Sequence, residues 1–510
     1  MSKNQNKKTM ISLVTSLIAM VLNLGISFFL SPYIVTNFGA EANGFAQLAN
    51  NFVNYASLLT IALNSMAGRF ITIAYHQNDL PACRRYYSSI IMGNLAILAL
   101  LVLPATVCVW KLERLLQIQT VEVIQVKLLF ALVFVNFFIS LFSGILNIPV
   151  YVKNMLYIQN IISMFQTLLR AVGLLLFFSV LTPKLYYVSL IGLILSLLSI
   201  PVLWVVKRKI FSEVRFCARD FRWHTIWQLM SSGVWNTVNQ CGNLLMTGFD
   251  LLLSNLFISP VQMGVLSIAK TVPNCIIQLA ATVNSSFSPN LTIAYASEDQ
   301  KQILASLRYA MKCSSVLVTV PIAVLCVYGT SFYSLWVPAM DAAELTLLSF
   351  LSCMAFVPFA GPQVLYGVYT TANKLKINSV TVVVGGVVNF IAVYFLLKHT
   401  SLGLIAVAGV SSLISIIRNL AITVPYTANI LKLKWYTFYK DVAVSTLCFV
   451  ISAGVCMLIQ KAILPHSWLR MVLSVGVACI ISAGLMLLVL LNKQEKQQFA
   501  SKFLRRFFHG

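Results

Sequence analysis

Charged residues are scarce in this sequence, and acidic residues are scarcer still. Only 10% of the 510 residues are charged, Asp and Glu together number 13, and 59% of the residues are hydrophobic. The mean hydropathy of +0.86 lies far above that of a soluble globular domain. A soluble fold is therefore excluded, and lipid is expected to be the solvent for most of the chain.

The sequence also lacks the motifs of common enzymes. It has no Gly-rich Walker loop, no HExxH and no Ser-His-Asp arrangement, and its five histidines are scattered. The eleven cysteines form no CxxC pair, and most lie in apolar stretches as small buried thiols. We therefore expect no metal, no cofactor and no disulfide framework, although a catalytic site built from buried helix residues stays an alternative.

Apolar stretches long enough to cross a membrane recur along the chain. A helix needs about 20 apolar residues to cross ~30 Å of hydrocarbon. The pattern predicts about fourteen spans, at residues 10–31, 45–72, 89–110, 128–149, 156–181, 186–206, 228–258, 262–293, 309–329, 345–370, 378–397, 402–424, 441–462 and 468–491. The predicted fold class is an all-α polytopic membrane protein.

The basic residues alternate between the two sides of these spans. With a cytoplasmic N-terminus, the inside segments carry 25 of the 36 Lys and Arg, the outside segments carry seven, and four lie within spans. This split follows the positive-inside rule. The excess of basic residues, which gives the net charge of +23, is therefore expected to orient the protein and to face anionic lipid headgroups. It predicts that both termini are cytoplasmic and that no nucleic acid is bound. The first apolar run is expected to be an uncleaved span rather than a signal peptide.

The chain matches itself at an offset of 220 residues. Residues 43–79 and 263–299 share 11 identities in 37 positions, among them Gly44 with Gly264. The matched segments are the second and eighth predicted spans, so the repeat unit has six helices and both copies have the same orientation. Parallel repeats of this kind are typical of transporters, with a substrate path between the two bundles. A duplication kept only for packing is the alternative.

The repeat predicts four parts of the chain. These are an N-terminal six-helix lobe (1–206), a cytoplasmic amphipathic linker (207–227), a C-terminal six-helix lobe (228–424), and two extra helices with a basic cytoplasmic tail (425–510). The linker carries six basic residues among apolar ones, which predicts a helix on the cytoplasmic membrane surface. The tail at 493–509 has a similar character, or is an ordinary solvated basic tail.

Four basic residues and Asp250 are assigned to the interior of predicted spans, where a charge at mid-bilayer costs roughly 2.5 to 3.5 kcal/mol and needs a partner or a water-filled cavity. Lys270 and Asp250 are central in their spans. Either they form an ion pair between helices, or they contact substrate or a coupling ion. Arg170 has no acid nearby in the sequence, which favours a position in a water-filled cavity over an ion pair. Arg69 and Arg418 lie near span ends, where snorkelling alone would explain them.

Amide side chains form polar stripes on two spans. The second span carries Asn50, Asn54 and Asn64, and the seventh carries Asn239 and Asn243, with several at spacings of three and four on one helix face. Such a stripe either joins helices or lines an aqueous cavity. Its presence in both repeats favours the cavity wall, which makes these amides candidate substrate ligands.

Two segments carry a family resemblance. They are NFGAEANGF at residues 37–45 and NSMAGRF at residues 64–70, and a weaker copy of this pattern follows Gly264. Together with the repeat, they make the chain resemble the polysaccharide flippases of the multidrug/oligosaccharidyl-lipid/polysaccharide exporter superfamily, above all the O-antigen and capsule repeat-unit branch. The resemblance in architecture covers essentially the whole chain. The related lipid II flippases carry an Arg in the first span, which this sequence lacks.

The resemblance implies two six-helix lobes, two appended C-terminal helices, and alternating access that moves an undecaprenyl-pyrophosphate-linked oligosaccharide to the outer leaflet of a bacterial inner membrane. A cationic cavity would receive the pyrophosphate, and its candidates are Arg170, Lys270, Arg69 and Arg418. The implied partners are the lipid-linked oligosaccharide and the lipid bilayer. Polysaccharide polymerase and chain-length machinery are candidate protein partners, and we expect a monomer.

Two other functions stay open from the sequence. A cation-coupled multidrug exporter of the same superfamily would use Asp250 as its binding residue. Four intramembrane cations against this single anion suit a diphosphate better than a cationic drug. The second alternative is a membrane-embedded glycan-transferring enzyme or assembly scaffold.

Overall fold

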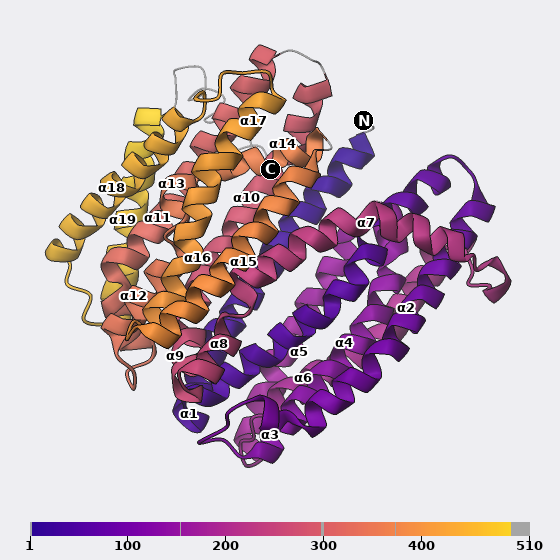
Figure 1. Cartoon of the computed structure of the whole chain (residues 1–510), viewed down its shortest axis with the longest axis horizontal. Helices are drawn as coiled ribbons and strands as arrows, with labels where there is room; N and C mark the ends of the chain where they lie inside the picture. Colours follow the sequence, from indigo (N-terminus) through magenta and orange to yellow (C-terminus); the bar gives the residue numbers. More distant parts are fainter. Residues whose placement is uncertain (1–2, 154, 297–299, 373, 491–510) are drawn as a thin grey trace. The chain divides into compact units, whose positions relative to one another are not determined.

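The computed structural model describes residues 3–153, 155–296, 300–372 and 374–490, and the elements of this part of the chain are helices (Figure 1). Within these ranges, 11 helices are long and apolar enough to cross a membrane. The protein is therefore an all-α, multi-pass membrane protein, as the sequence predicts. The predicted basic tail at 493–509 lies outside the described residues.

The difference between fourteen predicted spans and 11 long helices has two causes. The first two predicted spans are joined in a single helix, α1 (Lys3–His76), which bends at Gly39. The spans predicted at 228–258 and 345–370 are each divided into shorter helices. Gly39 has φ 84° and ψ 169°, a conformation that L side chains rarely adopt, so glycine is required at this bend.

The chain divides into two compact units, and the boundary between them in the sequence follows Gly264. The first unit, in indigo to magenta in Figure 1, contains α1 and the following helices: α2 (Leu80–Trp110), α3 (Leu112–Leu115), α4 (Val123–Val152), α5 (Leu156–Val180), α6 (Tyr187–Ile210), the short 3-10 helix η1 (Ala218–Asp220), α7 (Trp223–Asn243), the π-helix η2 (Leu244–Gly248) and α8 (Asp250–Phe257). Helix α9 (Pro260–Ala269) crosses the boundary.

The second unit contains the remaining helices. They are α10 (Thr271–Ala296), α11 (Gln300–Trp336), α12 (Ala342–Cys353), α13 (Phe356–Phe359), the 3-10 helix η3 (Pro362–Leu365), α14 (Tyr366–Thr371), α15 (Leu375–His399), α16 (Leu404–Arg418), the π-helix η4 (Asn419–Thr423), α17 (Val424–Ile430), α18 (Tyr439–Ala462) and α19 (Trp468–Leu490). The last two helices pack on α11, where buried residues such as Ala323, Tyr328 and Cys456 form a shared core.

Close packing of α1 against α7 shapes the first unit. A Cβ atom at Gly233 of α7 would lie 2.0 Å from the carbonyl oxygen of Ala62 in α1, so only glycine fits at this crossing. Since α7, η2 and α8 pack within the first unit, that unit extends beyond residue 206, the end of the N-terminal lobe drawn from the repeat. The lobe boundaries drawn from the repeat remain a prediction.

The two glycines that the sequence repeat pairs lie against each other. A Cβ at Gly44 would lie 3.0 Å from the backbone nitrogen of Gly264, and a Cβ at Gly264 would lie 2.3 Å from the carbonyl group of Ala40. Neither position has room for a larger side chain. The match between Gly44 and Gly264 therefore has a packing reason at this contact.

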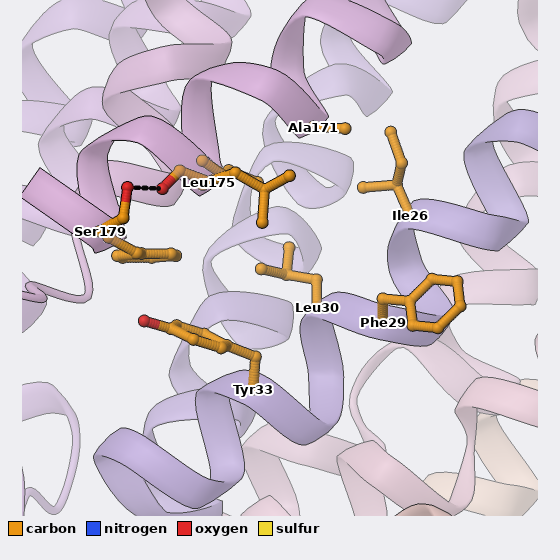
Figure 2. A pocket seen from close by; sticks show the side chains of 9 residues that line it. Ile26, Phe29, Leu30, Tyr33, Ala171, Leu175 and Ser179 are labelled. Atoms are coloured by element: carbon orange, nitrogen blue, oxygen red, sulfur yellow. Dashed lines mark hydrogen bonds between the residues drawn. The ribbon is translucent and has the colours of Figure 1, made fainter.

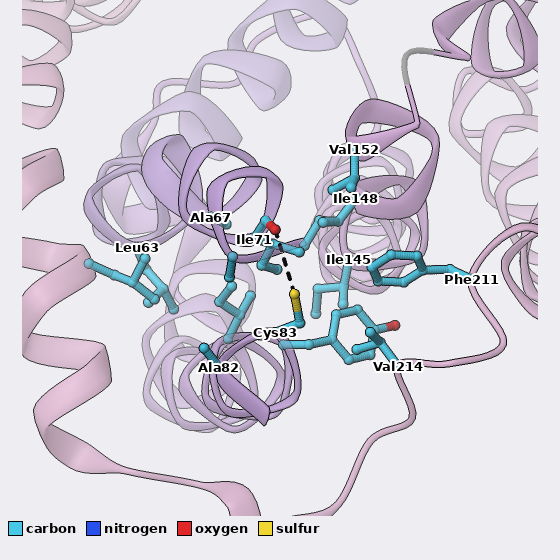
Figure 3. Close-up of a cluster of buried hydrophobic side chains, with 14 of the residues drawn as sticks. Leu63, Ala67, Ile71, Ala82, Cys83, Ile145, Ile148, Val152, Phe211 and Val214 are labelled. Atoms are coloured by element: carbon cyan, nitrogen blue, oxygen red, sulfur yellow. Dashed lines mark hydrogen bonds between the residues drawn. The ribbon is translucent and has the colours of Figure 1, made fainter. Parts of the chain in front are cut away.

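The linker after α6 differs from the predicted surface helix. Between Ile210 and Trp223 the chain is irregular except for the single turn of η1. Phe211 and Val214 are buried in a cluster at the ends of α1, α2 and α4, which Figure 3 shows with Leu63, Ala67, Ile71, Ala82, Cys83, Ile145, Ile148 and Val152. The predicted helix is wrong for residues 211–222, because the protein core rather than the membrane surface receives these apolar side chains.

Two serines of α2 hold the linker backbone in place. The N–H groups of Cys217 and Arg222 donate hydrogen bonds to the hydroxyls of Ser88 and Ser89, at 3.1 and 3.2 Å. Both serines are fully buried. These bonds satisfy backbone groups that a helix would otherwise have satisfied internally.

Candidate functional site

Arg170 lies in the middle of α5 without a hydrogen-bond partner for its buried Nε atom. Among the described residues it forms no ion pair. Ten residues separate it from Val180, the last residue of α5, which corresponds to about 15 Å along a helix. A guanidinium at this depth without a carboxylate is a candidate ligand for an anion that binds transiently.

An apolar pocket begins next to Arg170, between α1 and α5. Its volume is about 500 Å³, and Figure 2 shows its lining residues, which are Ile26, Phe29, Leu30, Tyr33, Ala171, Leu174, Leu175, Phe178 and Ser179. The Tyr33 and Phe178 rings stack with their centroids 4.7 Å apart. The Ser179 hydroxyl donates to the Leu175 carbonyl at 2.7 Å, so this polar group is satisfied within α5. The lining suits hydrocarbon rather than a polar ligand.

Arg418 is held in a polar cluster of the second unit. Its Nη2 atom donates to the Tyr366 hydroxyl at 2.9 Å and to Oδ1 of Asn419 at 3.0 Å. The Tyr366 hydroxyl and the Thr423 hydroxyl also donate to this Oδ1, at 2.6 and 2.9 Å. The Nε atom of Arg418 is buried and has no partner. The cluster thus orients one edge of the guanidinium and leaves Nε available for an anion.

Breaks in two helices bring this cluster together. Arg418 is the last residue of α16, and the π-helix η4 begins directly after it at Asn419. Tyr366 begins α14 directly after the 3-10 helix η3. Single-turn π-helices inside longer helices are frequently found at functional sites. The position of Arg418 is therefore set by polar partners, which snorkelling alone would not require.

The predicted amides of α1 have different surroundings. Asn64 exchanges two hydrogen bonds of 2.9 Å with Asn94 of α2, so its side chain joins two helices. Asn50 donates to the Ala46 carbonyl of its own helix at 2.8 Å and is exposed. Asn54 and Arg69 are also exposed. The stripe thus contains both a helix contact and open polar positions.

The amides of α7 precede a second π-helix, η2. Asn239 is half-buried, and Asn243, the last residue of α7, is exposed. The π-helix directs the Gly248 carbonyl toward α1, where the Tyr55 hydroxyl and the Asn51 amide donate to it at 2.6 and 3.3 Å. These bonds satisfy a carbonyl at a helix irregularity and attach η2 to α1.

Asp250 follows this π-helix as the first residue of α8 and is only 1% exposed. It lies near enough to the Tyr55 hydroxyl to act on it electrostatically. Its neighbour Phe249 stacks on the Tyr55 ring with centroids 4.7 Å apart. The ion-coupling role assigned to Asp250 remains a prediction.

Lys270 is half-buried between α9 and α10. Its N–H donates to the Leu266 carbonyl at 2.9 Å, and its own carbonyl accepts from the Asn274 N–H at 3.0 Å, so the helical path continues through it. Asp250 belongs to the first unit and Lys270 to the second. The substrate contact and the ion pair proposed for Lys270 remain alternatives.

Sequence reasoning did not single out Glu41 as a structural anchor. Its carboxylate is 1% exposed and accepts hydrogen bonds from the backbone N–H groups of Gln119 and Thr120, both at 2.8 Å. Asn255 of α8 holds the same connection, because its amide exchanges two bonds of 3.0 Å with the Gln117 backbone. The sequence signal that could have indicated this role is that Glu41 is an acidic residue inside the otherwise uncharged NFGAEANGF segment.

Comparison with known proteins gives three results. No family model matches the chain. It is 26% identical over 497 residues to the membrane protein EpsK of Bacillus subtilis (strain 168), which covers 97% of this chain and 98% of that protein. It is similar in structure to an inward-facing multidrug resistance MATE family transporter, with a TM-score of 0.66, 12% identity, and 83% and 98% of the two chains covered. It is also similar in structure to the lipid II flippase MurJ in an inward closed conformation. The TM-score is 0.63 and the identity is 14%, and the match covers 95% of this chain and 99% of the MurJ chain.

The fold is thus that of a membrane transporter, and the solved structures that it matches are transporters and flippases rather than enzymes. It is the fold of the multidrug/oligosaccharidyl-lipid/polysaccharide exporter superfamily, which confirms the resemblance predicted from the sequence. The similarity to EpsK extends over nearly the whole chain, and EpsK is also a membrane protein.

Proposed function

We propose that this protein flips an undecaprenyl-pyrophosphate-linked oligosaccharide from the cytoplasmic to the outer leaflet of a bacterial inner membrane by alternating access. One observation carries the proposal. Each compact unit contains an arginine in a membrane helix, Arg170 or Arg418, whose buried Nε has no partner and which forms no ion pair among the described residues.

Buried arginine donors without partners destabilise the fold. A buried donor without a partner costs about 1–3 kcal/mol, and more when it is charged. Selection retains such a cost where a ligand satisfies the group during function. Arginine pairs with phosphate oxygens through its planar set of N–H donors, and a diphosphate supplies several acceptors. The pyrophosphate of a lipid-linked sugar therefore fits these two residues.

The other predicted residues have places in this proposal. Lys270 adds a further cation, and the exposed side chains of Asn50, Asn54, Asn243 and Arg69 are open to sugar hydroxyls or phosphate. Both termini would be cytoplasmic, as the positive-inside distribution requires. A monomer would then deliver its substrate to a polysaccharide polymerase and chain-length machinery for O-antigen (lipopolysaccharide) or capsule synthesis.

A reconstituted transport experiment tests the proposal. Purified protein in liposomes should move a fluorescent undecaprenyl-pyrophosphate oligosaccharide between leaflets without changing it covalently. Arg170→Ala and Arg418→Ala should each lower the rate at least about tenfold, which corresponds to ~1.4 kcal/mol. The control is Arg470→Ala, because Arg470 is an exposed arginine at the start of α19. Unchanged rates in both arginine variants would contradict the proposal.

The alternative is a cation-coupled multidrug exporter, which the similarity to a MATE family transporter and the buried Asp250 favour. For this function Asp250 is the essential residue and the arginines are not. Cells that carry Asp250→Asn should then lose drug resistance while surface glycan stays unchanged. Lost glycan with unchanged drug resistance in the arginine variants supports the flippase instead.

A further inference from the structure

The contact between α1 and α5 changes character along its length. In its first half, polar bonds close the contact: the Asn160 amide donates to the Ser12 carbonyl at 3.0 Å and to the Thr15 hydroxyl at 3.1 Å, and the Thr167 hydroxyl donates to Oδ1 of Asn23 at 3.1 Å. Beyond Thr167 and Asn23, the polar bonds end and the apolar pocket of about 500 Å³ begins. The change falls at the level of Arg170.

The pocket is open on one side. Phe29 on α1 and Leu175 on α5 are 76% and 72% exposed, whereas Leu174 at the base is 5% exposed. Figure 2 shows Ala171 and Leu175 facing Ile26 and Leu30 across the pocket. No charged side chain lines it. An extended hydrocarbon chain can therefore enter from the side and replace water or mobile lipid on these surfaces.

Arg170 directly precedes the residues of α5 that line this pocket. On α5 it is one residue before Ala171 and four before Leu174, so it flanks the lining face of the helix. Side chains in a helix lean toward its N-terminus, so the guanidinium is expected between the pocket and the polar bond at Thr167. A cation with an unpartnered Nε at the end of an apolar groove matches an amphipathic anion with one long chain.

The depth of Arg170 distinguishes a transported lipid from a resident one. Its position about 15 Å from the end of α5 is near the middle of a ~30 Å hydrocarbon core. The phosphate of an ordinary membrane phospholipid stays at the interface and does not reach this level. A phosphate that reaches Arg170 belongs to a lipid in transit.

From these contacts we infer that the groove between α1 and α5 binds the polyprenyl chain of a polyprenyl diphosphate lipid while Arg170 binds its diphosphate. This inference rests on the proposed function and adds a chain-binding site to it. The lipid would remain partly held by protein during transport instead of leaving its whole chain in the bilayer. The groove then selects for the chain, and Arg170 selects for the diphosphate.

Photocrosslinking tests the site directly. The probe is undecaprenyl diphosphate with a diazirine in its chain, and it is added to liposomes that contain the full-length protein. It should label residues 26–33 and 171–179. Undecaprenyl diphosphate without the diazirine should compete for this labelling. Ala171→Phe fills the groove and should lower this labelling at least about fivefold. Ala99→Phe is the matched control, because Ala99 is exposed on α2. Thermal unfolding of both variants verifies that they fold.

The outcomes separate the groove from the proposed function. Transport with labelling elsewhere on the protein overturns the groove and leaves the flippase standing. Competed labelling of the groove without transport supports the site and contradicts the flippase. Photoactive phosphatidylcholine is the second probe. If it labels 26–33 and 171–179 as strongly, and undecaprenyl diphosphate does not compete, the groove holds ordinary membrane lipid and the inference is wrong.

Discussion

Each compact unit has an arginine in a membrane helix whose buried Nε has no partner, Arg170 in one and Arg418 in the other, but the surroundings of the two guanidiniums differ. Arg170 lies within the unbroken helix α5 and has an apolar pocket beside it. Arg418 lies where α16 becomes the π-helix η4, and Tyr366 and Asn419 hold it. An unbroken helix uses its own backbone groups and presents few polar partners, whereas a helix break brings polar side chains into one cluster.

This difference assigns separate tasks to the two residues in the proposed mechanism. Arg418 is oriented in advance, so binding an anion costs it little side-chain entropy. Arg170 is less constrained and can follow a ligand that moves past it. From the largest expected effect to the smallest, two pairs of variants compare positions in the two units, and two others test contacts within the first unit.

The largest effect concerns two helical glycines, Gly233 in the first unit and Gly409 in the second. A Cβ at Gly233 would lie 2.0 Å from the Ala62 carbonyl oxygen, whereas at Gly409 its nearest neighbour is a Leu351 side-chain atom at 3.7 Å. Gly233→Ala should destabilise the protein by about 3 kcal/mol through overpacking. Gly409→Ala should be neutral or stabilise it by up to about 1 kcal/mol. Unfolding in mixed micelles measures both, and equal effects would show that the helices separate easily at Gly233.

The Asn64–Asn94 pair tests whether amides of the first unit join helices. Asn64→Leu leaves the buried Asn94 amide without its partner and should cost about 1–3 kcal/mol of stability. The double variant Asn64→Leu, Asn94→Leu should recover part of this loss, because neither amide is then left unsatisfied. The same unfolding assay gives the coupling energy. Strictly additive losses would mean that the two amides act independently.

Exchange of arginine for lysine sharpens the comparison of the two cations. Arg418→Lys replaces a planar set of N–H donors with a compact ammonium, which cannot keep the bonds to Tyr366 and Asn419 and present a separate donor in the direction of Nε, so the transport rate should fall about tenfold. Arg170→Lys keeps a cation without disturbing any partner, and lysine also binds phosphate as a point charge, so the rate should change by less than about threefold. Rates in liposomes measure both variants. A larger loss at Arg170 than at Arg418 would reverse the assigned tasks.

The smallest effect is expected for a surface ion pair of the first unit. Lys127 and Glu113 are 3.0 Å apart, and the Glu113 side chain is 53% exposed. Solvent screens such pairs, so Glu113→Gln should change stability by less than about 1 kcal/mol and leave transport unchanged. This variant sets the baseline for the unfolding and transport assays. A strong transport defect would mean that this connection takes part in the transport cycle.

Several elements of the fold could be predicted because their signals are local in the sequence. Length and hydropathy predicted the membrane helices, and α2, α4, α15 and α18 each contain one predicted span. The prediction of a surface helix for the linker was wrong, because the same apolar residues fit a membrane surface or a protein core. Only the packing of Phe211 and Val214 decides between them.

The candidate site was predicted in part. Arg170 has no acid nearby in the sequence, and it forms no ion pair among the described residues, but the cavity expected around it remains a prediction. The partners of Arg418 were not predicted, since Tyr366 lies 52 residues away and has no motif that links the two. The pocket beside Arg170 also escaped prediction, because Leu and Phe on lipid-facing and pocket-facing surfaces have the same chemistry.

The sequence by itself determined that the chain spans the membrane many times and that a few charges lie in lipid-length helices. These properties follow from composition and spacing, because transfer into hydrocarbon acts on each segment separately. Only the tertiary structure decided which polar groups meet: Asn64 with Asn94, and Arg418 with Tyr366. The reason is physical, since a side chain in a membrane helix finds its hydrogen-bond partner on another helix, and the packing of helices is set by many contacts at once.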